Sequence, residues 1–169
     1  MDRSSEKGSA WVGYTMRAAT VDDFAFIHEL RVSGLREHVE RIWGWDDRDQ
    51  RARFARGFVA DAYQMIVVDG RDVGAVSIAW SADDVFVADI EIAAEWRGRG
   101  LGSAVLGDIL AEARRRGLPA RLQVLHGNPA RQLYERVGFE AIGETATHVA
   151  MRLAPPGTGV CGVDDHRAG

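Results

Sequence analysis

Residues 85–116 constrain the fold most, because a strand pattern, a glycine-rich turn and a helix pattern follow one another there without a break. Residues 85–92 alternate with a period of two, which predicts that Asp89 and Glu91 share a face with Val85 and Val87. The turn that follows reads Arg97-Gly98-Arg99-Gly100-Leu101-Gly102, and from Leu101 onward apolar residues recur at helical spacing. The stretch therefore predicts a sheet strand, a tight turn and a helix packed on that sheet.

The glycine turn is suited to a phosphate. Its three alternate glycines let the backbone approach a ligand closely, and the first N–H groups of the next helix lack partners within the helix. The positive end of the helix dipole favours an anion, and Arg97 and Arg99 add cations suited to a diphosphate. The alternative is a structural turn with two solvated arginines.

Two common nucleotide patterns do not fit this turn. A phosphate loop needs Lys after its last glycine, where this chain has Ser103. The dinucleotide pattern counted from Gly98 needs a glycine at position 103 and an acidic residue on the next strand, which offers Gln123. A dinucleotide-dependent oxidoreductase therefore stays a weak alternative.

Composition narrows the class of protein. A chain of 169 residues is about one domain long, and its net charge of −4 argues against nonspecific nucleic-acid binding. The sequence has no signal-peptide or membrane-span pattern, so we expect a soluble, cytoplasmic protein. The single Cys161 and five scattered histidines predict no disulfide and no metal site. We expect residues 1–13 to be a disordered leader or cloning remnant, 14–153 the domain and 154–169 a flexible tail.

Periodicity and turn signals place the remaining elements. Thr20 and Asp23 form a capping box that opens a helix, Gly44 ends it, and Asp46 caps a second helix. The strands that we predict besides 85–92 are 14–18, 65–68, 73–80, 121–125, 139–143 and 147–153, with a short helix ending at 137–138.

The motif R-x-x-G-x-G, read as Arg97, Gly100 and Gly102, resembles that of the GNAT superfamily of N-acetyltransferases. The order of elements over 14–153 is also similar to that of the family. The resemblance implies an α/β (α+β) fold with a mixed, mostly antiparallel sheet flanked by helices on both faces. It implies that acetyl-CoA binds here, with its pyrophosphate on the amides from Gly98 to Ser103 and its pantetheine arm paired with the strand end at Ile90, Glu91 and Ile92.

A second signature, residues 128–139, is similar to the family segment in which an Asn contacts the cofactor and a Tyr faces its sulfur. These residues are Asn128 and Tyr134 here. A phenol with a pKa of about 10 is protonated at neutral pH, so it suits a general acid for the departing thiolate. The alternative for Tyr134 is a half-buried side chain bonded to a carbonyl.

The acceptor amine must lose a proton before it attacks. Some relatives carry Glu on the strand after the glycine helix, but Gln123 at that position cannot accept a proton. Glu91 is the nearest substitute, and Asp89 is second. The alternative is that both carboxylates face solvent or pair with arginines.

Three further residues are candidates for contact with the acceptor. His126 follows the strand expected to splay from the central one, while Trp43 and Trp45 bracket Gly44 in the region that covers the acceptor in this family. Solvent exposure for His126 and core packing for a tryptophan are the alternatives.

The leading hypothesis is direct transfer of an acetyl group from acetyl-CoA to a primary amine of a small molecule or peptide, without a covalent enzyme intermediate. The rival is a noncatalytic acyl-CoA-binding or sensing module. We expect no nucleic-acid or membrane partner, and the terminal strands offer an edge through which a homodimer could form.

Overall fold

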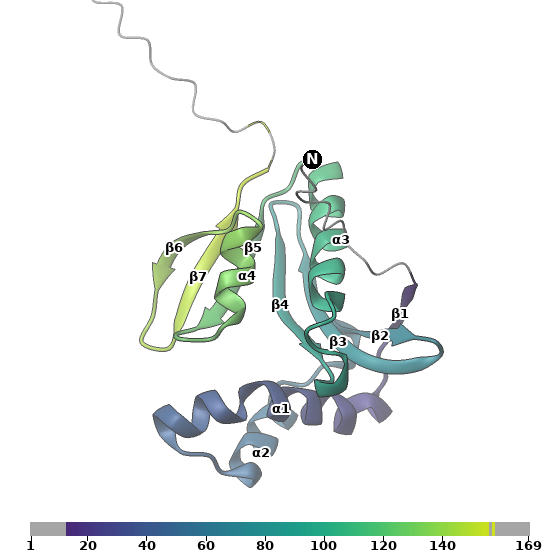
Figure 1. The fold of residues 1–169 in the computed structure, drawn as a ribbon, viewed down its shortest axis with the longest axis vertical. Coiled ribbons are helices and arrows are strands. Elements are labelled where there is room, and N and C mark those ends of the chain that lie inside the picture. Colours follow the sequence, from purple (N-terminus) through teal and green to yellow (C-terminus); the bar gives the residue numbers. More distant parts are fainter. Residues whose placement is uncertain (1–12, 156, 158–169) are drawn as a thin grey trace, which may run out of the picture.

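A computed structural model describes residues 13–155 and 157, without the side chains of residues 37, 38, 42 and 43 (Figure 1). Of the predicted leader (1–13) and tail (154–169), residues 1–12, 156 and 158–169 lie outside the described residues, and so do Cys161 and the Trp43 side chain. The elements run β1 (Tyr14–Ala18), η1 (Val21–Asp23), α1 (Phe24–Trp43), α2 (Asp47–Gly57), η2 (Ala60–Ala62), β2 (Tyr63–Val68), β3 (Arg71–Trp80), β4 (Val85–Ile92), η3 (Ala94–Trp96), α3 (Leu101–Arg115), β5 (Ala120–Leu125), α4 (Ala130–Arg136), β6 (Glu140–Glu144) and β7 (His148–Leu153).

The strands form one sheet in the order β1-β2-β3-β4-β5-β7-β6, which confirms the predicted mixed, mostly antiparallel architecture. The pair β4·β5 is parallel, and the other neighbours are antiparallel. Parallel pairing is confined to residues 85–87 against 120–122, and Figure 1 shows the two strands diverging beyond it. The later half of β4 therefore has an edge that β5 does not occupy.

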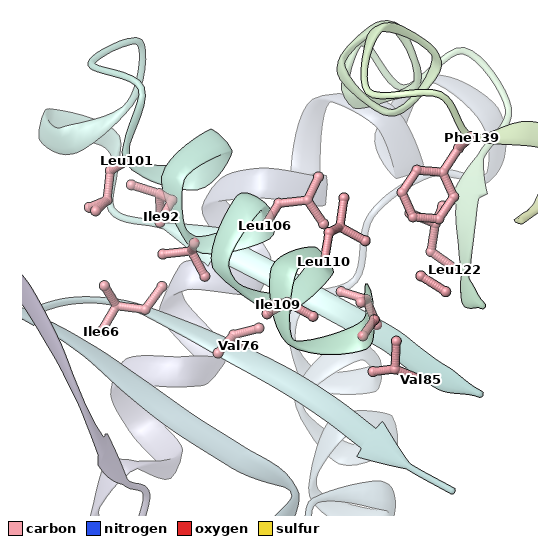
Figure 2. Close-up of a cluster of buried hydrophobic side chains, with 14 of the residues drawn as sticks. Ile66, Val76, Val85, Ile92, Leu101, Leu106, Ile109, Leu110, Leu122 and Phe139 are labelled. Carbon is pink, nitrogen blue, oxygen red and sulfur yellow. The ribbon is translucent and has the colours of Figure 1, made fainter. Parts of the chain in front are cut away.

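Helices cover both faces of the sheet. On one face, α3 packs on β2, β3 and β4 through a buried cluster that includes Ile66, Val76, Val85, Ile92 and Leu106 (Figure 2). On the other face, Ile27 and Leu30 of α1 pack against Met65 and Ala75. Each such fully buried aliphatic side chain contributes roughly 1.5–3 kcal/mol by leaving water. None of the helices in the described ranges is long and apolar enough to span a membrane.

The predicted helix boundaries hold with one difference in detail. Asp23 Oδ2 accepts from the Thr20 amide at 2.8 Å as a capping box requires, but the first turn is a 3-10 turn and α1 begins at Phe24. Gly44 ends α1 with a φ of 75°, and Asp46 Oδ1 accepts from the Asp49 amide at 3.0 Å to cap α2.

The predicted face of the β4 carboxylates was wrong. Ser77 pairs with Asp89 and Ile78 with Val87, so Ala88 is the extra residue of a β-bulge. A one-residue shift exchanges the two faces of a strand. Val85 and Val87 therefore face α3, whereas Asp89 and Glu91 face α1.

Candidate functional site

A cleft of about 960 Å³ opens where β4 and β5 part. Its walls come from α1, β4, the glycine turn, β5, α4 and the start of β7. It brings together most of the residues predicted for cofactor binding and catalysis: Ile90, Glu91, Ile92, Arg97, Gly98, Gly100, Leu101, Gly102, Ser103, Asn128 and Tyr134. Arg99, Trp45 and His126 are not part of this lining.

The glycine turn presents backbone to the cleft. Gly98 and Gly100 have φ values of 71° and 85°, a left-handed conformation that favours glycine. In the part of the chain that the structure describes, no side chain caps α3 at Gly100, and the one atom within 4 Å of a Cβ at Gly102 is Ile92 Cγ1, at 3.7 Å. Uncapped amides beside open space fit a pyrophosphate, so the turn can hold the cofactor predicted for it.

The two arginines of the turn have partners within the protein. Arg97 donates from Nε to the Ile92 carbonyl at 2.8 Å and from Nη2 to Ser33 Oγ at 3.0 Å, which ties the turn to both β4 and α1. The Arg99 guanidinium lies 5.2 Å from the centre of the Trp96 ring. Arg97 therefore fixes the turn, and it would have to exchange partners to contact a phosphate.

Glu91 projects from β4 towards α1 and is half-buried. Burial raises its pKa to about 8, the neighbouring Asp89 charge adds to the rise, and Arg31 and Arg97 oppose it. Asp89 is paired with Arg31, whose Nη1 lies 2.5 Å from Asp89 Oδ2. A group with a pKa near 8 can both accept and release a proton at neutral pH.

Tyr134 stands on α4 across the same cleft. Its ring packs edge-on against Phe139 at 6.0 Å, and burial, with the charges of Glu91 and Asp89, raises the pKa of its phenol. The hydroxyl therefore keeps its proton well above neutral pH. Asn128 Oδ1 accepts from the Ala130 amide at 2.9 Å, so Asn128 starts α4 as well as lining the cleft.

Two smaller cavities flank the cleft on the side of α1 and α2. Trp45 lines both of them, one of about 380 Å³ and one of about 700 Å³, and its Nε1 donates to Asp47 Oδ1 at 2.7 Å. His126 is held away from the cleft lining, with Nε2 2.9 Å from the Thr145 carbonyl. His148 at the start of β7 lines the cleft in its place.

Sequence reasoning missed Arg31, Gly34 and His148. Arg31 and Gly34 reach the β4 carboxylates only because α1 folds onto that face of the sheet. A glycine inside a helix pattern was the one local signal for Gly34, since glycine there is unfavourable unless packing requires it. Gln123 lines the cleft with an amide, as its sequence position implied.

The geometry agrees with comparisons to known proteins. A family model described as the acetyltransferase (GNAT) family matches residues 18–139. No curated protein sequence matches the chain.

Solved structures share the fold at low identity. The PaiA N-acetyltransferase of Thermoplasma acidophilum, in complex with coenzyme A, superposes with a TM-score of 0.69 at 12% identity, over 85% of this chain and 99% of that one. The ribosomal-protein-S18-alanine N-acetyltransferase of Escherichia coli gives 0.59 at 19% identity, over 83% and 92%. Arabidopsis thaliana Naa50, in complex with the bisubstrate analogue CoA-Ac-MVNAL, gives 0.57 at 15% identity, over 85% and 99%.

The family match covers more than half of the chain and includes the glycine turn, β4 and α4. The chain therefore belongs to the GNAT acetyltransferase family, and acetyl-CoA is its cosubstrate.

Proposed function

We propose that this protein transfers the acetyl group of acetyl-CoA to a primary amine of a small molecule or peptide, by direct attack of the amine. One observation carries the proposal: a half-buried carboxyl, Glu91, and a half-buried phenol, Tyr134, line one cleft together with the glycine turn. Acetyl-CoA supplies the activated thioester when it is bound.

Glu91 serves as the base. A lysine-like amine has a pKa of about 10.4, which is about 2.4 units above the pKa of Glu91. Moving a proton from the ammonium to the Glu91 carboxylate therefore costs roughly 3.3 kcal/mol. A carboxyl with the ordinary pKa of 4.5 would face a cost of about 8 kcal/mol for the same transfer. Burial of Glu91 therefore makes it much the better proton acceptor.

Tyr134 serves as the acid. Its raised pKa keeps a hydrogen on the hydroxyl, which can be donated to the sulfur as the thiol departs. The edge of β4 at Ile90 and Ile92, which β5 does not pair with, would hold the pantetheine arm by strand-like hydrogen bonds. The two residues then act on opposite ends of the transfer, at the nitrogen and at the sulfur.

Peptide amines belong among the acceptors to be tested. The name of the Escherichia coli neighbour specifies an alanine of a ribosomal protein, and the analogue bound to the Arabidopsis neighbour links CoA to a peptide. Trp45 beside the cleft offers an apolar wall for the body of the acceptor.

The test is the release of the CoA thiol from acetyl-CoA across a panel of small amines and short peptides. An acetyltransferase shows saturable release that depends on one class of amine. Tight binding of acetyl-CoA in calorimetry, with release no faster than background hydrolysis for every amine, would favour the noncatalytic acyl-CoA-binding module.

A further inference from the structure

Helix α1 meets the β4 carboxylates through Arg31 and Gly34. Arg31 Nη1 lies 2.5 Å from Asp89 Oδ2, and a Cβ added at Gly34 would lie 2.6 Å from Glu91 Oε2. Resting on the proposed function, we propose that Arg31 is a positioning residue: by holding Asp89 in an ion pair, it leaves Glu91 as the carboxyl on this face of β4 that takes the proton of the acceptor amine.

Asp89 and Glu91 need a partner that distinguishes them, because both are carboxyls. Asp89 and Glu91 lie two residues apart on one half-buried face of β4, and two carboxyls this close do not ionise independently. Without a fixed partner, one proton would be shared between them. Burial raises the pKa of both carboxyls, and the 2.5 Å contact of Arg31 opposes that rise at Asp89, so the proton goes to Glu91 first.

Arg31 is held in place by more than its carboxylate. Its guanidinium lies 5.4 Å from the centre of the Phe54 ring of α2, a cation–π arrangement that fixes its direction. Arg31 lines both the main cleft and the cavity of about 380 Å³ beside it. It therefore forms part of the wall between the reacting groups and the α1–α2 side of the site.

The charged and titratable groups around Glu91 come from several elements. They are Asp89 of β4, Arg31 of α1, Arg97 after η3, Tyr63 of β2 and Tyr134 of α4. Arg97 is bonded to Ile92 and Ser33, and the two phenols are uncharged at neutral pH. Neutralising Asp89 or Arg31 singly should therefore change the charge around Glu91 most.

Gly34 completes the arrangement by shape. Glycine in a helix interior is less favourable than alanine by about 1 kcal/mol, yet any side chain here would overlap the Glu91 carboxyl. Because the overlap is with the end of a flexible side chain, Gly34→Ala leaves the fold intact and turns the carboxyl away from α1.

The experiment follows both carboxyls directly, by the pH dependence of their side-chain carboxyl carbon signals in full-length protein labelled with ¹³C-glutamate and ¹³C-aspartate and assigned with Glu91→Gln and Asp89→Asn. We expect a Glu91 midpoint near pH 8 in the wild type. In Arg31→Gln the two carboxyls should share one proton, so that the Glu91 and Asp89 signals change together in two pH steps. Arg31→Lys keeps the charge and should stay near the wild type, and Asp89→Asn should move the midpoint downward.

The Glu91 and Asp89 titrations can confirm or refute the positioning role of Arg31. An unchanged Glu91 midpoint in both Arg31→Gln and Asp89→Asn would overturn the positioning role, and so would a wild type in which Asp89 titrates near pH 8 and Glu91 does not. Asp89→Asn is nearly isosteric, so it serves if Arg31→Gln fails to fold. The titration needs no acceptor, so a failure of acetyl transfer shows separately, as an amine panel without turnover in a protein whose Glu91 midpoint still moves.

Discussion

Replacing Glu91 with Gln removes the proton acceptor and keeps the shape of the side chain. In the wild type, the reactive combination of ionised Glu91 and protonated amine increases tenfold per pH unit up to about pH 8 and then levels off. In Glu91→Gln, only the neutral amine reacts, and its fraction keeps rising to the pKa of the amine. The kcat/KM of the wild type therefore exceeds that of Glu91→Gln by a constant factor below about pH 8, and by a smaller factor above it.

The pKa of Glu91 determines how far the two kcat/KM values converge above pH 8. For an amine with a pKa of about 10.4, the interval above pH 8 is about 2.4 pH units, so the deficit of Glu91→Gln shrinks by up to about 250-fold. We expect a deficit of roughly 10²-fold at pH 7, the low end for a general base, and little deficit near pH 10. The assay is the initial rate of CoA release with one amine between pH 6 and pH 10.

The matched control is Glu95→Gln, which neutralises an exposed carboxylate of η3 outside the cleft lining. Its profile should follow that of the wild type. A Glu91→Gln profile parallel to the wild type at every pH would refute the assignment of Glu91 as base.

Three further predictions concern the acid and the cofactor turn. Tyr134→Phe removes only the hydroxyl, so calorimetry should show unchanged binding of acetyl-CoA while kcat falls roughly 10²-fold; an unchanged kcat would exclude an acid role. Gly102→Val places a branched side chain in the cleft and should abolish CoA binding, while Gly107→Val, on the same helix and facing open space, should not. If the two variants bind CoA with equal affinity, the glycine turn is not part of the cofactor site. Arg97→Ala should weaken CoA binding by roughly 1–3 kcal/mol, through a looser turn and a lost cation, and Arg99→Ala should weaken it to a similar extent. CoA binding should also weaken as salt is added. If both alanine variants bind CoA as tightly as the wild type at every salt concentration, neither arginine contributes to cofactor binding.

Local patterns predicted most of the fold. The alternation at 85–92, the period change at Leu101, the capping box at Thr20 and the glycine at 44 each act over a few residues, and the structure confirms each element. The bulge at Ala88 could not be predicted in this way, because it depends on how β3 pairs with β4. One extra residue there decides that Glu91 faces α1.

In the candidate site, too, residues in local motifs could be predicted and residues brought in by long-range contacts could not. The glycine turn and Tyr134 carry local motifs, so the sequence led to them and the structure brings them into one cleft. Arg31 and Gly34 lie more than fifty residues from the carboxyls that they contact, and nothing local marks such a pairing. His126 illustrates the reverse: its loop position suggested contact with the acceptor, but a hydrogen bond to Thr145 holds it outside the cleft lining.

The most direct test of the account is a single-turnover experiment with acetyl-labelled acetyl-CoA, excess enzyme and the amine that gives the fastest CoA release in the panel. After rapid quenching, the label on the amine and the free thiol should appear at one rate, with no label on the protein at any time. Label that appears first on the protein, or thiol that appears without labelled amine, would contradict direct transfer in the cleft between β4 and β5.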